Sequence, residues 1–214
     1  MKKIISFLMI LSTLNAVEYL DIEYGQSVTN YTDGDTLTVK GYAFAYNEIN
    51  ANYLLSLSFS ELPQQSSPTT VSGVQYDYQF KGSGYGIGFA YKVLQLDEIF
   101  IAPILSYNYT SIQYNHRRLS DGATTSLTTS SDSDLSLSIM SGYDYAESSF
   151  IYISLKVDSD LLESEDRDNH NLKIGITHML NRNFMGGVAY SRQLSTKDTI
   201  DDSTSMSINI GFIF

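Results

Sequence analysis

The sequence predicts an all-β chain that closes into an antiparallel transmembrane β-barrel, most simply with ten strands and alternatively with eight. Three observations lead to this prediction. Apolar and polar residues alternate along most of the chain, which is the period of a strand with one apolar and one polar face. The connections between the alternating runs are alternately long and short. After the first residues, no segment approaches the roughly 18 continuous apolar residues of a membrane-spanning helix.

The first residues are typical of a cleaved secretory signal. Two lysines precede an apolar run at residues 4–11, and small or polar residues follow it up to Ala16. The apolar run is shorter than the roughly 20 residues that a spanning helix needs. We therefore expect cleavage after Ala16, which leaves a signal peptide at residues 1–16 and one barrel domain at residues 17–214.

The composition excludes several function classes. The formal net charge is -11, and it becomes -13 when Lys2 and Lys3 leave with the signal peptide (-11 - 2 = -13). Such an acidic chain repels phosphate, so we expect no nucleic-acid partner. The chain has no Cys and therefore no disulfide, while 17 Tyr and 10 Phe fit a strand-rich protein. Nothing in the sequence calls for a cofactor.

Ten alternating runs follow one another along the chain. In order they are residues 20–24, 36–40, 55–60, 84–91, 99–110, 135–145, 151–158, 172–177, 184–191 and 205–214. In each run we assign the apolar set to the outer, lipid-facing side. For the second run this places Leu37 and Val39 outside, and it places Tyr42 and Phe44 inside with Lys40.

The connections favour a membrane barrel over a soluble sandwich. After odd-numbered strands the gaps are polar and mostly long: 29–34, 62–75, 115–134, 159–169 and 195–203. After even-numbered strands they are short: 47–52, 94–98, 146–149 and 181–183. Long outer loops and short periplasmic turns are the asymmetry of outer-membrane barrels. The sheet must close because lipid cannot form hydrogen bonds with an open strand edge.

Aromatic residues complete the pattern. Tyr and Phe recur near strand ends, as in the girdles of membrane barrels, and the chain stops on Phe214 in the lipid-facing register. With strand units such as residues 38–44 and 84–91, the mature chain resembles the small OmpA- or opacity-type outer-membrane β-barrels of Gram-negative bacteria. This resemblance implies a place in the cell outer membrane, and it implies that barrel-assembly machinery reads the last strand through Phe214. It supplies no catalytic residues.

Charged residues are expected inside the barrel. The inward positions carry Asp21, Glu23, Lys40, Asp144, Lys156 and Lys173. We predict that each lysine lies within reach of Asp21, Glu23 or Asp144, because an unpaired charge in a narrow lumen is unfavourable. A barrel of about eight strands is just filled by its side chains, so a ten-stranded lumen should be largely filled as well.

The outer loops hold most of the acidic residues. They are Asp158, Asp160, Glu163, Glu165, Asp166, Asp168, Asp198, Asp201 and Asp202. Such oxygen-rich clusters can bind divalent cations, which could bridge to lipopolysaccharide phosphates, or they are simply solvated loops. Arg117 and Arg118 can contact anionic lipid headgroups or form a plain positive patch.

Two apparent motifs carry no chemistry. Gly82, Gly84, Gly86 and Gly88 imitate a nucleotide-binding loop, but their spacing of two puts them on one strand face, where they leave room inside the barrel. The three His residues have no metal-site spacing, and no metal is expected. Only His170, near Asp166 and Asp168, is placed to serve a membrane hydrolase.

Three functions fit these observations. The first, which we favour, is a structural or surface-interaction barrel in the outer membrane. The second is a narrow channel for small solutes or ions. The third is a membrane-embedded lipid hydrolase or acyltransferase, which we set aside, so that the protein is expected not to be an enzyme.

Overall fold

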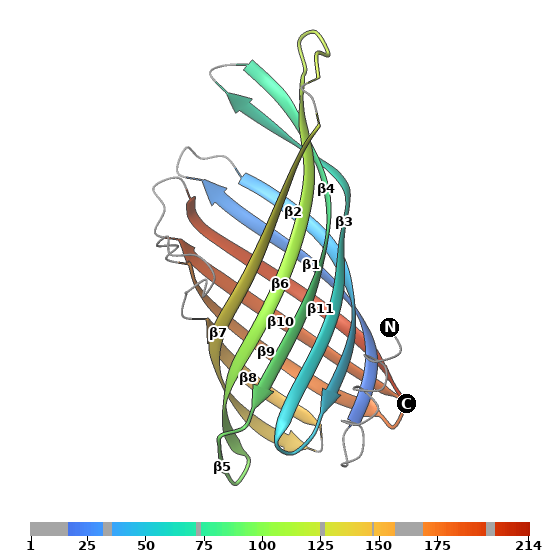
Figure 1. The fold of residues 1–214 in the computed structure, drawn as a ribbon, viewed down its shortest axis with the longest axis vertical. Coiled ribbons are helices and arrows are strands. Elements are labelled where there is room, and N and C mark those ends of the chain that lie inside the picture. The colour runs from blue at the N-terminus through green and yellow to red at the C-terminus, as the bar shows by residue number, and fades with distance from the viewer. Residues whose placement is uncertain are drawn as a thin grey trace.

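The chain forms a single closed β-barrel whose strands are strongly tilted (Figure 1). The computed structural model describes residues 17–31, 36–71, 74–124, 127–146, 148–156, 169–195 and 200–214. No helix of the described residues is long and apolar enough to cross a membrane. The signal-peptide prediction concerns residues 1–16, which lie outside the described residues.

Ten strands form the barrel wall, as predicted. They are β1 (Val17–Tyr31), β2 (Thr36–Ile49), β3 (Tyr53–Val71), β4 (Val74–Tyr91), β6 (Ile99–Arg118), β7 (Thr128–Ala146), β8 (Ser149–Lys156), β9 (Asn169–Asn181), β10 (Phe184–Ser195) and β11 (Ile200–Ile213). An additional three-residue strand, β5 (Leu94–Leu96), pairs with β6 within the connection between β4 and β6.

Each strand is antiparallel to the next one along the chain, and the first and last strands pair with each other. Leu20 lies opposite Phe212 across β1 and β11, and the pairing of β4 with β6 completes the ring. The connections from β2 to β3, β4 to β6, β7 to β8 and β9 to β10 lie at one end of the barrel, together with Val17 and Phe214 (Figure 1). We name this the turn end, and the opposite end the hairpin end. In outer-membrane barrels the short turns face the periplasm.

Two predicted loops are wrong in extent. Residues 62–75 were expected to be a loop, but β3 continues to Val71 and β4 begins at Val74. Residues 115–134 likewise belong largely to β6 and β7, which form hairpins that rise beyond the rest of the barrel (Figure 1). Antiparallel hydrogen bonds join backbones and need no apolar side chains, so these polar strands continue outside the membrane.

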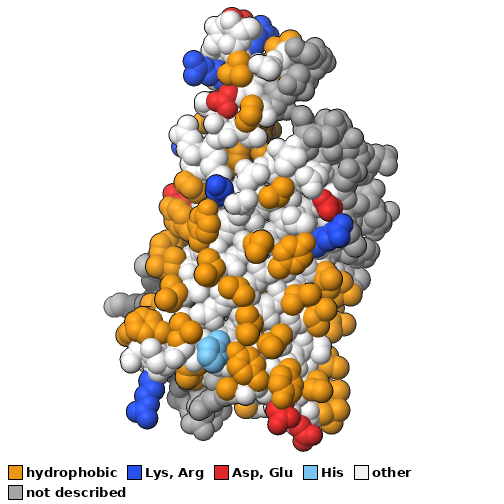
Figure 2. All heavy atoms as spheres, turned by 180° about the vertical axis from the view of Figure 1, so that it is seen from behind, with side chains coloured by type: hydrophobic (Ala, Val, Ile, Leu, Met, Phe, Trp, Pro, Cys, Tyr) orange, Lys and Arg blue, Asp and Glu red, His pale blue; other side chains and the backbone are white. Residues whose placement is uncertain are grey.

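The alternation of apolar and polar residues places an apolar band on the outer surface (Figure 2). The outer side of β11 carries four apolar residues that are each at least half exposed: Met206, Ile208, Ile210 and Phe212. Its inner side carries Ser205, Ser207, Asn209 and Gly211. These faces agree with the prediction for the last strand. Lipid contact requires apolar side chains on the outside, and the closed ring leaves no unpaired edge within this band.

The predicted facing of β2 is wrong. Tyr24 lies opposite Tyr42 and Ile22 opposite Phe44, so the aromatic residues of β2 share the outer face of β1. Phe44 is 48% exposed on that face. Lys40, two residues before Tyr42 and opposite Gln26, is therefore also directed outward.

The glycine stripe of β4 faces the lumen, as predicted. A Cβ atom on Gly84 would lie 2.7 Å from the backbone oxygen of Tyr109, so the wall itself excludes a side chain there. A Cβ atom on Gly88 would have nothing within 4 Å. The stripe therefore serves close strand packing at one position and open space at another.

Candidate functional site: the barrel lumen

The turn end of the lumen is filled by apolar side chains. The buried cluster contains Tyr19, Ile49, Ala90, Phe100, Ala102, Met140, Phe150 and Met185, contributed by strands all round the barrel. Phe100 and Met185 are 0% exposed. The Phe100 ring lies against Gly142, where an added Cβ would collide with it. This apolar base, as we name the cluster, separates the lumen from the turn end.

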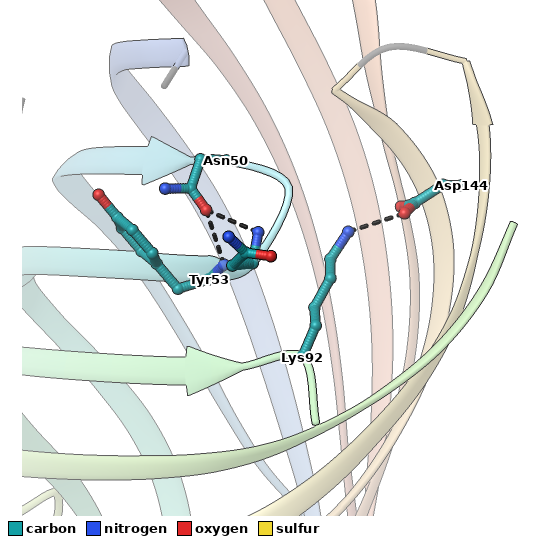
Figure 3. A network of polar contacts seen from close by, with 5 residues as sticks. Asn50, Tyr53, Lys92 and Asp144 are labelled. Atoms are coloured by element: carbon teal, nitrogen blue, oxygen red, sulfur yellow. Dashed lines mark hydrogen bonds and ion pairs between the residues drawn. The ribbon is translucent and has the colours of Figure 1, made fainter. Parts of the chain in front are cut away.

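An ion pair lies beside the apolar base. Lys92 follows β4, and its Nζ atom is 2.7 Å from Oδ2 of Asp144 on β7 (Figure 3). The Lys92 side chain is only 6% exposed, and its ammonium also lies 4.3 Å from the centre of the Phe100 ring. A cation can approach an aromatic face in this way because the ring carries a negative quadrupole. The two contacts tie three neighbouring strands together at the base.

A cavity of about 510 Å³ occupies the lumen above the base. Small side chains make room for it, including Ser138, Ser154, Ser191, Ser205 and Ser207. A second cavity of about 240 Å³ lies against the apolar base and shares Ser154 and Lys173 with the first. The lumen, predicted to be largely filled, therefore contains open space above the base and a smaller space against it.

Four charged residues line the upper cavity. Lys156 of β8 forms an ion pair of 2.6 Å with Asp134 of β7, and both side chains are 29% exposed. Lys173 of β9 donates a hydrogen bond to the Tyr152 hydroxyl and interacts electrostatically with Glu23 of β1. The fourth, Glu61, accepts a hydrogen bond from the Tyr42 hydroxyl.

Five of the six predicted lumen charges lie on inward positions. The strand registers place these five on the inner face: Asp21, Glu23, Asp144, Lys156 and Lys173. Asp21 is buried and accepts a hydrogen bond of 2.8 Å from Nδ2 of Asn209. Lys40 is the exception, because β2 turns its other face to the lumen.

The predicted partners are mostly wrong. Asp144 pairs with Lys92, and Lys156 pairs with Asp134; neither partner was among the predicted lumen charges. Lys173 interacts electrostatically with Glu23, one of the predicted carboxylates, without forming a contact ion pair with it. Lys92 was missed because it lies beyond the last alternating residue of its strand, and Asp134 because it was counted as the end of a loop. The alternation of side chains could have identified both, because each lies an even number of residues from a residue that faces inward on the strand that it belongs to or follows.

The barrel wall has a seam between β2 and β3. Their pairing begins at Ile49 and Leu54 and ends at Tyr42 and Glu61. Beyond that point the Gln65 side chain replaces the backbone pairing. Its Oε1 accepts a hydrogen bond of 2.7 Å from the Lys40 backbone N–H, and its Nε2 donates one of 2.5 Å to the Lys40 carbonyl oxygen. Residues on both sides of the seam line the upper cavity.

The hairpin end carries a cluster of aromatic rings on the faces of β4 and β6 that are continuous with the lumen side. The Tyr78 and Tyr114 rings stack with centroids 5.7 Å apart and an interplanar angle of 28°, and the His116 ring lies 4.7 Å from that of Tyr78. The two tyrosines and His116 are half-buried. His116 therefore lies on a strand with aromatic neighbours, not in a loop.

The tip of the β6–β7 hairpin holds an ion pair. Nη1 of Arg118 is 3.1 Å from Oδ2 of Asp121, and the Ala123 backbone N–H donates a hydrogen bond of 3.0 Å to the other carboxylate oxygen. That backbone hydrogen bond, and after it the charge of Arg118, lower the pKa of the Asp121 carboxyl below its ordinary value. Arg118 is thus already paired within the hairpin.

The structure describes only some of the remaining predicted sites. Phe214 lies on the outer face, 63% exposed, with its ring 6.4 Å from that of Tyr46, which agrees with the lipid-facing register. Of the acidic loops, residues 158–168 and Asp198 lie outside the described residues. Asp202 is described, and it pairs with Arg192 at 3.1 Å and accepts a hydrogen bond from Asn30. The His170 side chain also lies outside the described part.

Neither a protein-family model nor any curated protein sequence matches the chain. Several solved structures are similar to it, among them the following three. The transport unit of the autotransporter AIDA-I from Escherichia coli has a TM-score of 0.54 at 11% identity, over 98% of this chain and 94% of that one. The outer-membrane protease OmpT from Escherichia coli has 0.50 at 7% identity, over 93% and 96%. The attachment invasion locus protein Ail of Yersinia pestis has 0.44 at 15% identity, over 94% and 100%.

At these identities the likeness concerns the fold alone. The fold is that of the bacterial outer-membrane β-barrels, which confirms the predicted fold class. A transport unit and a protease share this fold, so the fold does not decide the task. The task has to be argued from the lumen and the surface of this chain.

Proposed function

We propose that this protein is a closed outer-membrane β-barrel with a structural or surface-interaction role. The observation that carries the proposal is the apolar base. Phe100 and Met185 are completely buried at the turn end of the lumen, together with Phe150 and Met140. A hydrated ion would have to leave its water to pass such a cluster, which is unfavourable without polar partners.

The width of the barrel supports a closed lumen. Ten strands lie close to the eight-stranded case, in which side chains fill the interior, and far from the 16 to 18 strands of open porins. The Lys92–Asp144 pair adds an electrostatic tie beside the base. In this proposal the apolar base closes the turn end of the lumen, and the hairpin end contacts other surfaces.

The projecting hairpins are the surface that this role would use. They carry the aromatic cluster of Tyr78, Tyr114 and His116 outside the apolar band, at the end that faces away from the periplasm in outer-membrane barrels. We propose that the barrel contacts outer-membrane lipid and lipopolysaccharide, that divalent cations assist at the acidic loops, and that barrel-assembly machinery recognises the last strand through Phe214. We propose no enzymatic activity.

Planar-bilayer conductance of the refolded protein tests the closed lumen. We expect no steady current from the unmodified chain. The variant that combines Phe100→Ser and Met185→Ser should conduct, because it replaces the centre of the apolar base by small hydroxyl residues. A steady, ion-selective current from the unmodified chain would overturn the proposal.

The alternative is a narrow channel for small solutes or ions. The observation in its favour is the pair of cavities that share Ser154 and Lys173, because they leave the apolar base as the barrier to passage among the described residues. The same conductance experiment separates the two functions. In a channel, Lys173→Met would change the ion selectivity of the current.

A further inference from the structure

Three of the four charged residues that line the upper cavity have no contact ion pair within the described part of the chain, and one of them, Glu61, accepts a hydrogen bond from the Tyr42 hydroxyl. Lys92 and Lys156 are each joined to an aspartate at less than 3 Å. Glu23 and Lys173 also face the lumen, but no described group of opposite charge lies within 4 Å of either carboxylate or ammonium. They interact only through the space of the cavity that both of them line.

Each of these charges has free hydrogen-bonding capacity. The Lys173 ammonium has three donors, of which the Tyr152 hydroxyl accepts one. The Glu23 carboxylate offers about four acceptor positions and forms no contact ion pair with a described group. Lys173 is enclosed by the barrel wall and nevertheless exposed to the water-accessible lumen. A bound molecule could therefore reach both groups without breaking an existing ion pair.

The wall between the two charges is polar and made of small residues. Glu23 belongs to β1 and Lys173 to β9, and the two strands between them, β10 and β11, contribute Ala189, Ser191, Ser205 and Ser207. Their hydroxyls can donate or accept hydrogen bonds. The volume of about 510 Å³ falls within the range of small-molecule sites.

The charges of the cavity decide the class of ligand. A simple anion at Lys173 would meet the repulsion of Glu23, and a simple cation at Glu23 would meet that of Lys173. A zwitterion can satisfy both, with its acidic group on Lys173 and its ammonium on Glu23. Charge-assisted hydrogen bonds of this kind are stronger than neutral ones.

We propose that the upper cavity binds a small zwitterion of the size of an amino acid or short peptide, held by Lys173 through its carboxylate and by Glu23 through its ammonium. The serine side chains of β11 and β10 offer hydrogen bonds to the peptide group between the two ends. The site needs no passage through the apolar base, so it is compatible with a barrel that does not conduct.

Isothermal titration calorimetry of the refolded full chain in detergent micelles tests the ligand class. The probes are the dipeptide Ala-Ala, its N-acetylated form, which is only anionic, and its C-terminal amide, which is only cationic. Each lost charge removes one charge-assisted hydrogen bond, so we expect Ala-Ala to bind roughly 10- to 100-fold more tightly than either capped form. Equal affinity for all three peptides would overturn the proposal.

Variants assign the two ends of the ligand. Lys173→Met should abolish the advantage of Ala-Ala over its amide, and Glu23→Gln should abolish its advantage over the N-acetylated form. Lys40→Met is the matched control, because Lys40 lies on the outer face, and it should leave all affinities unchanged. Circular dichroism verifies that each variant is folded, as does the difference in electrophoretic mobility between heated and unheated samples. A preference for Ala-Ala that survives both lumen variants would contradict the assignment.

A phosphate-bearing zwitterion identifies the source of the ligand. If glycerophosphoethanolamine competes with Ala-Ala and loses affinity in the same two variants, the ammonium-and-anion chemistry is supported with a lipid headgroup as its natural source. If it does not compete while Ala-Ala binds as expected, the carboxylate of a free peptide or amino acid is supported.

Discussion

The two halves of the lumen are built from the same ten strands and nevertheless differ in what fills them. At the turn end, buried apolar side chains pack together, with the smaller cavity against them. Further along, serine, glycine and alanine line a cavity that contains charged groups. Strand number and tilt fix the width of a barrel, so the size of the inward side chains decides whether a given height is closed or hollow.

The charges of the two halves differ in the same way. The Lys92 side chain is 6% exposed and lies beside an aromatic ring, although its partner Asp144 is 25% exposed, whereas Lys156 and Asp134 are both 29% exposed. A buried charge depends on its partner, and a hydrated charge does so much less. The comparison therefore predicts a stability role for the base and a binding role for the upper cavity.

The largest effect should come from the base itself. Phe100→Ala removes a completely buried ring and should lower the free energy of unfolding by about 3–5 kcal/mol. Phe89→Ala is the control on the lipid side, where acyl chains can refill the space, and it should lower that free energy by less than about 2 kcal/mol. Urea titration of the protein in lipid vesicles measures both. Equal losses would show that the base is not a packed core.

The second effect compares the two ion pairs. Lys92→Met removes an ammonium that is only 6% exposed, together with its contact to the Phe100 ring, and should lower the free energy of unfolding by about 1–3 kcal/mol, because Asp144 itself is 25% exposed. Lys156→Met should lower it by at most about 1 kcal/mol, because water can reach Asp134. The same urea titration decides. If the Lys156 variant is the less stable one, the upper cavity is drier than its shape indicates.

The sequence anticipated the barrel because covalent geometry fixes the period of two and lipid fixes which set must be apolar. The rule fails where the lipid ends. On β2 the outward residues beyond Tyr42 are Lys40 and Thr38, whereas Val39 faces the lumen, so the apolar set changes sides at that level. Alternation alone cannot show where a strand leaves the membrane.

The internal contacts of the candidate site depend on pairing across strands. Lys92 and Asp144 are 52 residues apart, and their contact follows from the registers of β4, β6 and β7. A sequence shows which residues can face inward but not which of them share a height. For this reason most inward charges could be predicted and most of their partners could not.

The third effect compares the inner and outer faces at one height. Lys173 and Ile174 are neighbours on β9, with the first facing the cavity and the second the lipid. Ile174→Arg should lower the free energy of unfolding in vesicles by about 2–4 kcal/mol if it lies near the bilayer midplane. Lys173→Met should change it by less than about 1 kcal/mol, because the lysine has no contact ion pair to lose. Refolding titrations that give the opposite order would invert the assigned faces.

The smallest effect compares two glycines on the inner face of β4, one in the packed wall and one beside a cavity. Gly84→Ala would place a Cβ atom 2.7 Å from the backbone oxygen of Tyr109, which cannot move without disturbing the pairing of β4 and β6. We expect it to lower the free energy of unfolding by about 1–3 kcal/mol, as overpacking does.

Gly88→Ala adds its methyl group to open space, because nothing lies within 4 Å, and Gly88 lines the lower cavity. It should be neutral or raise the free energy of unfolding by up to about 1 kcal/mol, since alanine restricts the unfolded chain more than glycine does. Both variants change one strand by one methyl group, so urea titration of the pair isolates local space from strand propensity. A loss of stability in the Gly88 variant as large as in the Gly84 variant would mean that the lumen beside β4 is packed rather than hollow.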